Sequence, residues 1–158
     1  MSNPEEDIVE GCLRNDRKAQ HLLYKRYSAN MMVVAMRYSK SDQEAEDIVQ
    51  EAFIKVFKNL KSFRKDSKIE FWIKRIVINT ALNHQRSKLY LYPMVDVDNL
   101  HNHKDEGDLT MAGYDFKELI SMIQELPTGC QVIFNLYAIE GFNHQEIAKK
   151  LNISVGTS

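Results

Sequence analysis

Apolar side chains recur at intervals of three and four residues along most of this chain, and no stretch keeps the alternation of a half-buried strand. This periodicity predicts an all-α protein. Capping residues and breaks in the pattern divide the chain into separate helices. Helix starts are marked by Asn3, by Asp16, by Ser41 or Asp42, and by Asn143 or His144. The expected helices cover about residues 4–14, 17–39, 42–60, 69–89, 114–125, 128–141 and 143–151.

Charge is divided unevenly between the two parts of the chain. Residues 1–89 contain 17 basic and 12 acidic side chains, whereas residues 90–158 contain 4 basic and 10 acidic ones. Between the two helical parts, the stretch 90–113 holds proline, glycine and five acids against one lysine. We therefore expect two small helical domains, 1–89 and 114–158, joined by an acidic linker.

Several classes of protein are disfavoured by composition. No apolar run approaches the ~20 residues needed to cross a bilayer, and the N-terminal segment MSNPEED is acidic, unlike a signal peptide. We therefore expect a cytoplasmic protein with no membrane insertion. Cys12 and Cys130 belong to no CxxC pattern, so we expect two reduced, mostly buried thiols, no metal and no cofactor. No nucleophile–base set, paired carboxylates or glycine-rich phosphate loop is recognisable, so we do not expect an enzyme.

The stretch 53–88 concentrates positive charge among aromatic residues. It contains ten Lys or Arg side chains and two acids, although the whole protein has a formal net charge of −1. Cations suit phosphates, and flat apolar rings suit unpaired bases. The pattern favours binding to single-stranded or melted nucleic acid. The aromatic residues of the stretch are Phe53, Phe57, Phe63, Phe71 and Trp72.

A polar stripe on the helix expected at 69–89 is the strongest candidate for a nucleic-acid face. At 100° per residue its members fall within a sector of about 80°, beside an apolar sector. Arginine suits phosphates and guanine edges, and asparagine suits adenine. A basic loop precedes this helix, and an ordinary solvated face with a buried tryptophan is the alternative interpretation. The candidate DNA-binding residues are Lys61, Phe63, Arg64, Lys65, Lys68, Trp72, Arg75, Asn79, Asn83 and Arg86.

The helix expected at 42–60 has a second unusual face. Its apolar positions Ala45, Ile48, Val49, Ala52, Phe53, Val56 and Leu60 follow helical spacing and should face the core. The opposite face carries an isoleucine among polar residues, which is either a tolerated surface residue or the apolar centre of a small interface. The residues of this face are Asp47, Gln50, Glu51, Ile54 and Lys58.

Residues 141–158 read as the first part of a helix-turn-helix. Ile147, Ala148 and Leu151 form the buried stripe of its first helix, and Ser154 is suited to cap the next one. The helix that would enter the major groove should begin near Val155, and we expect this chain to stop before it. The residues assigned to the motif are His144, Glu146, Ala148, Ser154 and Thr157.

Two sets of motifs, in order along the chain, resemble bacterial sigma factors of the extracytoplasmic function (ECF) group. DIVQEAFIKVF at 47–57 and FWIKRI at 71–76, with Phe63, Asn79 and Arg86, resemble region two. The short motifs LP, VIF, EGF, EIA and ISVGT between 126 and 157 resemble region four.

This resemblance implies a dissociable subunit that binds core RNA polymerase and promoter DNA. It implies that the face around Ile54 docks on polymerase, that the basic loop and the 69–89 helix capture the melted −10 strand, and that region four of an intact chain binds the −35 duplex. It also implies a possible anti-sigma factor and a truncation within region four.

Two other functions remain open from the residues alone. One is a stand-alone helix-turn-helix transcriptional regulator, which is disfavoured because the basic and aromatic stretch lies outside the helix-turn-helix. The other is a helical interaction protein that binds no DNA, in which the basic stretch is only a solvated face. Binding to core RNA polymerase separates the three hypotheses.

Overall fold

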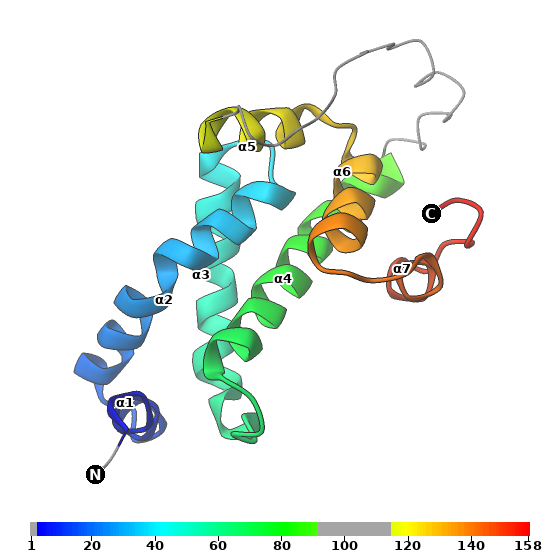
Figure 1. The fold of residues 1–158 in the computed structure, drawn as a ribbon. Helices are drawn as coiled ribbons and strands as arrows, with labels where there is room; N and C mark the ends of the chain where they lie inside the picture. The colour runs from blue at the N-terminus through cyan, green and yellow to red at the C-terminus, as the bar shows by residue number, and fades with distance from the viewer. Residues whose placement is uncertain (1–2, 92–114) are drawn as a thin grey trace. The chain divides into compact units, whose positions relative to one another are not determined.

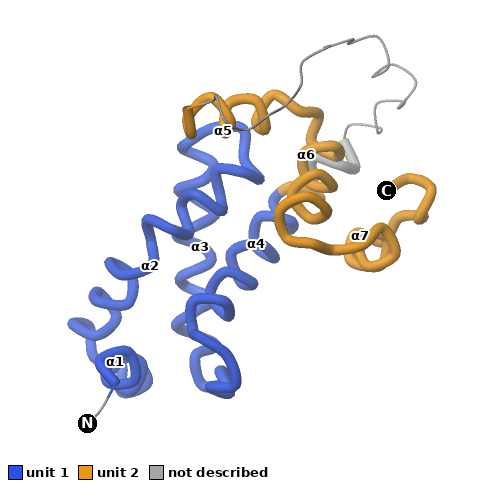
Figure 2. The backbone as a smooth tube through the Cα atoms, in the orientation of Figure 1, with its two compact units in different colours: residues 1–84 blue, residues 85–158 orange. Residues whose placement is uncertain are grey.

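The structure is a computed structural model that describes residues 3–91 and 115–158, with side chains in the C-terminal part of α4 described as far as residue 86. All regular elements in these residues are helices, as the sequence predicts, and the chain divides into two compact units, 1–84 and 85–158 (Figure 2). The acidic linker expected at 90–113 lies almost entirely outside the described residues, although its first two residues belong to α4. The domain bounds therefore stay predictions.

Unit 1 is built from four α-helices. They are α1 (Pro4–Leu13), α2 (Arg17–Tyr38), α3 (Asp42–Asn59) and most of α4 (Ile69–Leu91), with a short 3₁₀ turn η1 (Leu60–Ser62) after α3 (Figure 1). The helix starts are capped as expected, because Asn3, Asp16 and Ser41 each accept a hydrogen bond from a backbone N–H of the first turn.

The core of unit 1 lies between these helices. The α3 stripe expected from the sequence is buried throughout, from Ala45 to Leu60. On α2 the sequence places a core stripe at Leu22, Leu23, Tyr27, Met31, Val34, Ala35 and Tyr38, and all of these are buried except Leu22, which is 50% exposed. Leu22 lies about 100° around the helix from Leu23, on the side away from most of the stripe, which explains the error. A Cβ atom at Gly11 would lie 2.5 Å from that of Ala19, so α1 packs directly against α2 at this glycine.

Unit 2 contains the end of α4 and three shorter helices. They are α5 (Phe116–Glu125), α6 (Thr128–Phe134) and α7 (His144–Leu151). The helix expected at 128–141 forms, but its second half is a π-helical turn, η4 (Asn135–Ile139), which closes with a bond from the Glu140 N–H to the Asn135 carbonyl (2.9 Å). Gly141 then adopts φ +78°, which reverses the chain toward α7 at little steric cost.

Candidate nucleic-acid interface

The basic loop, residues 61–68, begins within η1 and leads into α4. It is exposed, as a segment predicted to bind nucleic acid must be. Lys61, Arg64, Lys65 and Lys68 all reach solvent. Lys65 has φ +57°, an uncommon conformation for a residue with a side chain, so the loop makes a sharp local turn there. Together with α1 and α2, the loop lines an open groove of about 660 Å³ whose other walls include Arg26, Asn30 and Glu70.

Two aromatic residues of the predicted DNA face are brought together by the fold. The ring centroids of Phe63, in the loop, and Trp72, in α4, are 5.5 Å apart with an angle of 47° between the rings. Both side chains are half-buried, so each keeps part of its ring surface open to solvent. Trp72 is therefore half-buried and not buried, and this exposure does not decide between a DNA face and an ordinary solvated face.

The polar stripe of α4 is formed as predicted. Arg75, Asn79, Asn83 and Arg86 are exposed, whereas Ile69, Ile73, Val77 and Ala81 of the neighbouring apolar sector are buried and Ile76 is half-buried. The Arg86 guanidinium donates a hydrogen bond to the Lys150 carbonyl (3.1 Å), so part of this side chain is engaged within unit 2.

An aromatic residue that the predicted DNA-binding set omits is 59% exposed at the start of α4. Phe71 lies one turn before Arg75 and extends the polar stripe toward the basic loop. The signal that could have identified it was present in the sequence, because Phe71 belongs to the aromatic residues of the basic stretch. Helical projection places it about 40° from Arg75, on the same side of the helix.

On α3, the predicted partner-binding face is also at the surface. Asp47, Gln50 and Lys58 are exposed, and Ile54 is 56% exposed among them. An apolar side chain of this size surrounded by polar residues fits the centre of a small interface. The Asp47 carboxylate accepts a hydrogen bond from the Gln43 amide (3.4 Å) on the preceding turn.

Glu51, the fifth residue of that face, has close partners inside unit 1. One carboxylate oxygen lies 2.6 Å from His84 Nε2 on α4, and the other lies 3.0 Å from Lys55 Nζ. The hydrogen bond with His84 and the one with Lys55 hold the pKa of Glu51 below its usual value, and partial burial opposes them. The sequence gives no indication of this contact, because nothing in a linear pattern pairs His84 with Glu51, which lies 33 positions earlier.

Within unit 2, the helix-turn-helix segment has a well-defined start. Asn143 and Glu146 form a reciprocal capping box at the beginning of α7, with both hydrogen bonds at 2.9 Å. Glu146, predicted as a motif residue, is therefore a capping residue. Ala148 is 5% exposed, in line with its predicted place in the buried stripe.

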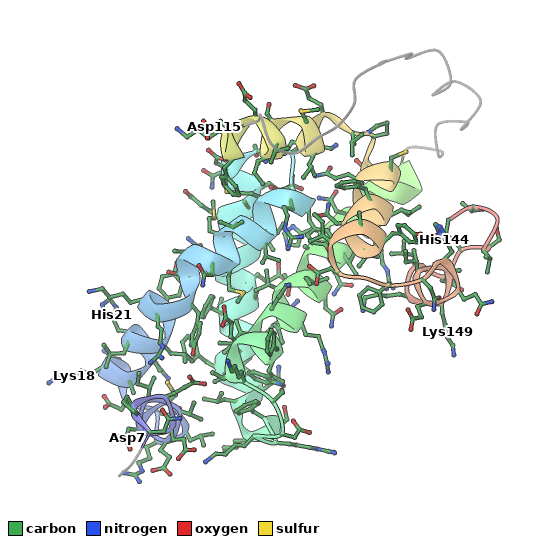
Figure 3. The ribbon with its side chains drawn as sticks, viewed as in Figure 1. Asp7, Lys18, His21, Asp115, His144 and Lys149 are labelled. Carbon is green, nitrogen blue, oxygen red and sulfur yellow. The ribbon has the colours of Figure 1, made fainter. Side chains whose placement is uncertain are left out.

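His144 and the turn after α7 complete this region. His144 lies on α7 (Figure 3). Its ring stacks on Tyr137 with centroids 4.6 Å apart, and its Nδ1 lies 3.0 Å from the Ser158 hydroxyl. After Asn152 in a left-handed conformation (φ +56°), the Ser154 hydroxyl accepts a hydrogen bond from the Thr157 N–H (3.2 Å). The bond has the form of a helix cap, as predicted for Ser154, but residues 155–157 form a turn and the described chain has no helix after Leu151.

Two further observations concern the described residues. No helix among them is long and apolar enough to cross a membrane. Over the same part of the chain, no three His, Cys, Asp or Glu side chains gather in a group that could hold a metal ion, and Cys12 and Cys130 are free thiols, the first buried and the second half-buried.

A polar, aromatic-flanked stripe on α4 and the capped helix α7 with the turn after it are features expected of an all-helical DNA-binding protein. Comparison with known families identifies the protein family. Residues 23–89 match the family "Sigma-70 region 2", and residues 116–158 match "Sigma-70, region 4".

Relatives among characterised proteins agree with these two matches. The chain is 32% identical to the RNA polymerase sigma-H factor of Pseudomonas aeruginosa over 97% of its own length and 85% of that protein. It is also 32% identical to the ECF RNA polymerase sigma-E factor of Escherichia coli, over 95% of its length and 84% of that protein. A solved structure of CnrH in complex with the cytosolic domain of CnrY has the same fold, with a TM-score of 0.52 and 20% identity over 98% of this chain and 86% of that one.

This chain therefore belongs to the ECF group of the sigma-70 family and is a sigma factor that directs transcription initiation. The two other functions left open by the residues are set aside by this membership. The expectation of a truncation within region four stays a prediction.

Proposed function

We propose that this sigma factor binds core RNA polymerase through the exposed face of α3 and the promoter −10 element through α4 and the basic loop. The observation that carries the proposal is the match to both sigma regions in one chain, in the order that the sequence motifs predict. The accessibility of the candidate residues on α3, the basic loop and α4 supports it, because none of them is buried: Phe63, Trp72 and Glu51 are half-buried and the others are exposed.

The −10 side of the proposal rests on the charge and aromatic surface of the basic loop and of α4. Lys61, Arg64, Lys65 and Lys68 supply cations for the backbone of a melted strand. The half-open rings of Phe63 and Trp72 supply surfaces on which unpaired bases can stack. The polar stripe then reads base edges or phosphates along α4. Its residues are Arg75, Asn79, Asn83 and Arg86.

The polymerase side rests on the isolated apolar residue of α3. Ile54 is 56% exposed, and the neighbouring Asp47, Gln50, Glu51 and Lys58 form a polar rim around it. Interfaces of this kind gain most of their affinity from a few central, desolvated residues, while the rim supplies specificity. We assign Ile54 that central place.

In unit 2 we propose that the helix-turn-helix segment contributes to binding of the −35 duplex. The capping box holds the first helix in place, and His144, Ser154 and Thr157 lie at its two ends. Residues 1–89, 90–113 and 114–158 then serve as region two, an acidic linker and region four. The protein acts by binding, without catalysis or cofactor, in the cytoplasm where transcription takes place.

A protein that restrains this sigma factor is a further part of the proposal. The structurally similar CnrH is in complex with the cytosolic domain of CnrY, and this chain shares its fold. We propose that an anti-sigma factor of this kind binds the present chain and competes with polymerase.

Binding to core RNA polymerase is the first test. The chain, labelled with a fluorophore, is titrated with Escherichia coli core polymerase and followed by anisotropy. We expect binding that Ile54→Glu weakens. A well-folded wild-type chain that does not bind core polymerase would refute the proposed function.

A further inference from the structure

Four side chains form a cluster that joins α3 to α4 within unit 1. Glu51 and Lys55 lie one turn apart on α3, and Thr80 and His84 lie one turn apart on α4. His84 Nε2 is 2.6 Å from one Glu51 oxygen, and Lys55 Nζ is 3.0 Å from the other and 3.4 Å from Thr80 Oγ1. The cluster therefore links the two helices at two places, through Glu51 and His84 and through Lys55 and Thr80.

The chemistry of the cluster favours a fixed geometry. Thr80 is 1% exposed, and its hydroxyl donates to the Ile76 carbonyl (2.8 Å), so its oxygen is oriented to accept from Lys55. The short contact between His84 and Glu51 is of the charge-assisted kind, which is strong and directional. The side chains of His84 and Glu51 are 30% and 45% exposed, and partly exposed pairs add little to overall stability. A role in setting the position of the helices explains the cluster better than a role in stability.

The position of the cluster connects the two faces of the proposed function. Glu51 directly follows Gln50 on the polymerase-facing side of α3, and His84 directly follows Asn83 of the DNA-facing stripe of α4. If α4 shifts along α3, Asn79 and Asn83 move relative to a polymerase docked on α3. A small shift would therefore impair DNA capture more than core binding, because the bond of His84 is to Glu51 and not to Ile54, the proposed centre of the α3 face.

We propose that His84 is a positioning residue, which acts through Glu51 to hold the DNA-facing stripe of α4 in place relative to the polymerase-facing helix α3. The proposal rests on the proposed function of these two faces. The Glu51 carboxylate has about four sites that can accept hydrogen bonds, so it serves His84 and Lys55 and still has capacity for a partner at the surface.

Two substitutions at one position separate this role from a general loss of structure. The amide nitrogen of glutamine reaches about as far as the histidine Nε2, which contacts Glu51, whereas that of asparagine reaches only as far as Nδ1. His84→Gln should keep the bond to Glu51 and His84→Asn should lose it. His21→Asn, at an exposed histidine of α2, is the matched control for the lower helix propensity of asparagine (Figure 3).

Two affinities are measured for each variant. The first is for Escherichia coli core polymerase. The second is the affinity of the resulting complex with polymerase for a fluorescein-labelled single-stranded oligonucleotide. The sequence of this oligonucleotide is selected from a random pool by the wild-type complex. We expect His84→Asn to weaken oligonucleotide binding about tenfold with core binding within about twofold. His84→Gln and His21→Asn should stay within about twofold of wild type in both.

Three outcomes would overturn the positioning role. They are unchanged oligonucleotide binding by His84→Asn, equal losses by His84→Asn and His84→Gln, and an equal loss of both affinities in His84→Asn. If the wild-type chain does not bind core polymerase, the proposed function fails and this inference fails with it. If the wild-type chain binds core polymerase and DNA but the two His84 variants do not differ, only the inference fails.

Discussion

The two units of this sigma factor differ in how much of their apolar surface they bury. Unit 1 covers its apolar stripes along α2, α3 and α4, and Ile54 and Phe71 are among the few large apolar residues it leaves more than half exposed. In unit 2, only five apolar residues of the described chain are buried. Its exposed apolar residues include Phe116, Phe134, Tyr137, Ile139 and Val155, each more than 40% exposed.

This difference shows which exposed residues carry information about function. Single exposed apolar residues are normal at protein surfaces, but in a unit with a well-covered core Ile54 is one of only a few, and its polar neighbours on α3 are what support the proposed contact surface. In a small unit with few buried residues, many apolar side chains are exposed simply because the helices are short. The same degree of exposure therefore supports a sharper hypothesis for Ile54 than for Tyr137.

The largest expected effect concerns the DNA face of unit 1. Trp72→Ala and Asn79→Ala should weaken binding of the −10 strand by about 10- to 100-fold, since a stacked base or a good base contact contributes about 1–3 kcal/mol. Core binding should change little. Open-complex formation and core affinity are measured side by side, with Trp72→Phe as the aromatic control. Equal losses of both activities would refute the assignment of this face.

The second effect concerns the single exposed isoleucine of α3. Ile54→Glu should weaken core binding by about fivefold or more, because truncation or charging of a central interface residue costs above about 1 kcal/mol. The melting temperature should stay unchanged, since the side chain is 56% exposed. Leu22→Glu, at an apolar residue of α2 that is 50% exposed, is the matched control. If both variants bind core polymerase as the wild type does, Ile54 is only a tolerated surface residue.

In unit 2, the capping box of α7 provides a smaller and local effect. Asn143→Ala should destabilise α7 by about 1 kcal/mol, because it removes the acceptor for the Glu146 N–H. We expect faster amide hydrogen exchange in α7 and unchanged exchange in α3. Asn143→Ser keeps a capping oxygen and should restore protection. Equal acceleration in both helices would mean that the two units do not unfold separately.

The smallest effect is the pH dependence that arises from Glu51. Its pKa is lowered in the folded protein, chiefly by the hydrogen bond with His84 and then by the one with Lys55. Its contribution to stability is therefore fully present above the usual value of 4.5 and is lost as the pH falls through the folded pKa. Because the side chain is 45% exposed, we expect less than about 1 kcal/mol.

Urea unfolding of wild type and Glu51→Gln at several pH values between about 3 and 6 measures this contribution. The wild type should lose more stability than the variant as the pH falls below the usual value of 4.5. Parallel curves for the two proteins would show that the bonds of Glu51 do not persist in solution.

Most of the secondary structure could be predicted from the sequence because it depends on local patterns. Helical spacing identified the buried stripe of α3 and the exposed Ile54, and Asn3, Asp16, Ser41 and Asn143 marked helix starts. The error at Leu22 shows the limit of this approach. An apolar residue at the edge of a buried stripe cannot be assigned to the core or to the surface without knowing how much of the helix its packed neighbours cover.

By itself, the sequence determined the all-helical class, the division of charge and the two sets of sigma motifs, since each depends on residue type and spacing along one segment. Only the tertiary structure decided which distant side chains meet. It placed Phe63 against Trp72, and it placed His84 on Glu51. These contacts depend on how two helices are packed and rotated against each other. That arrangement results from the sum of all core contacts and leaves no local signal in the chain.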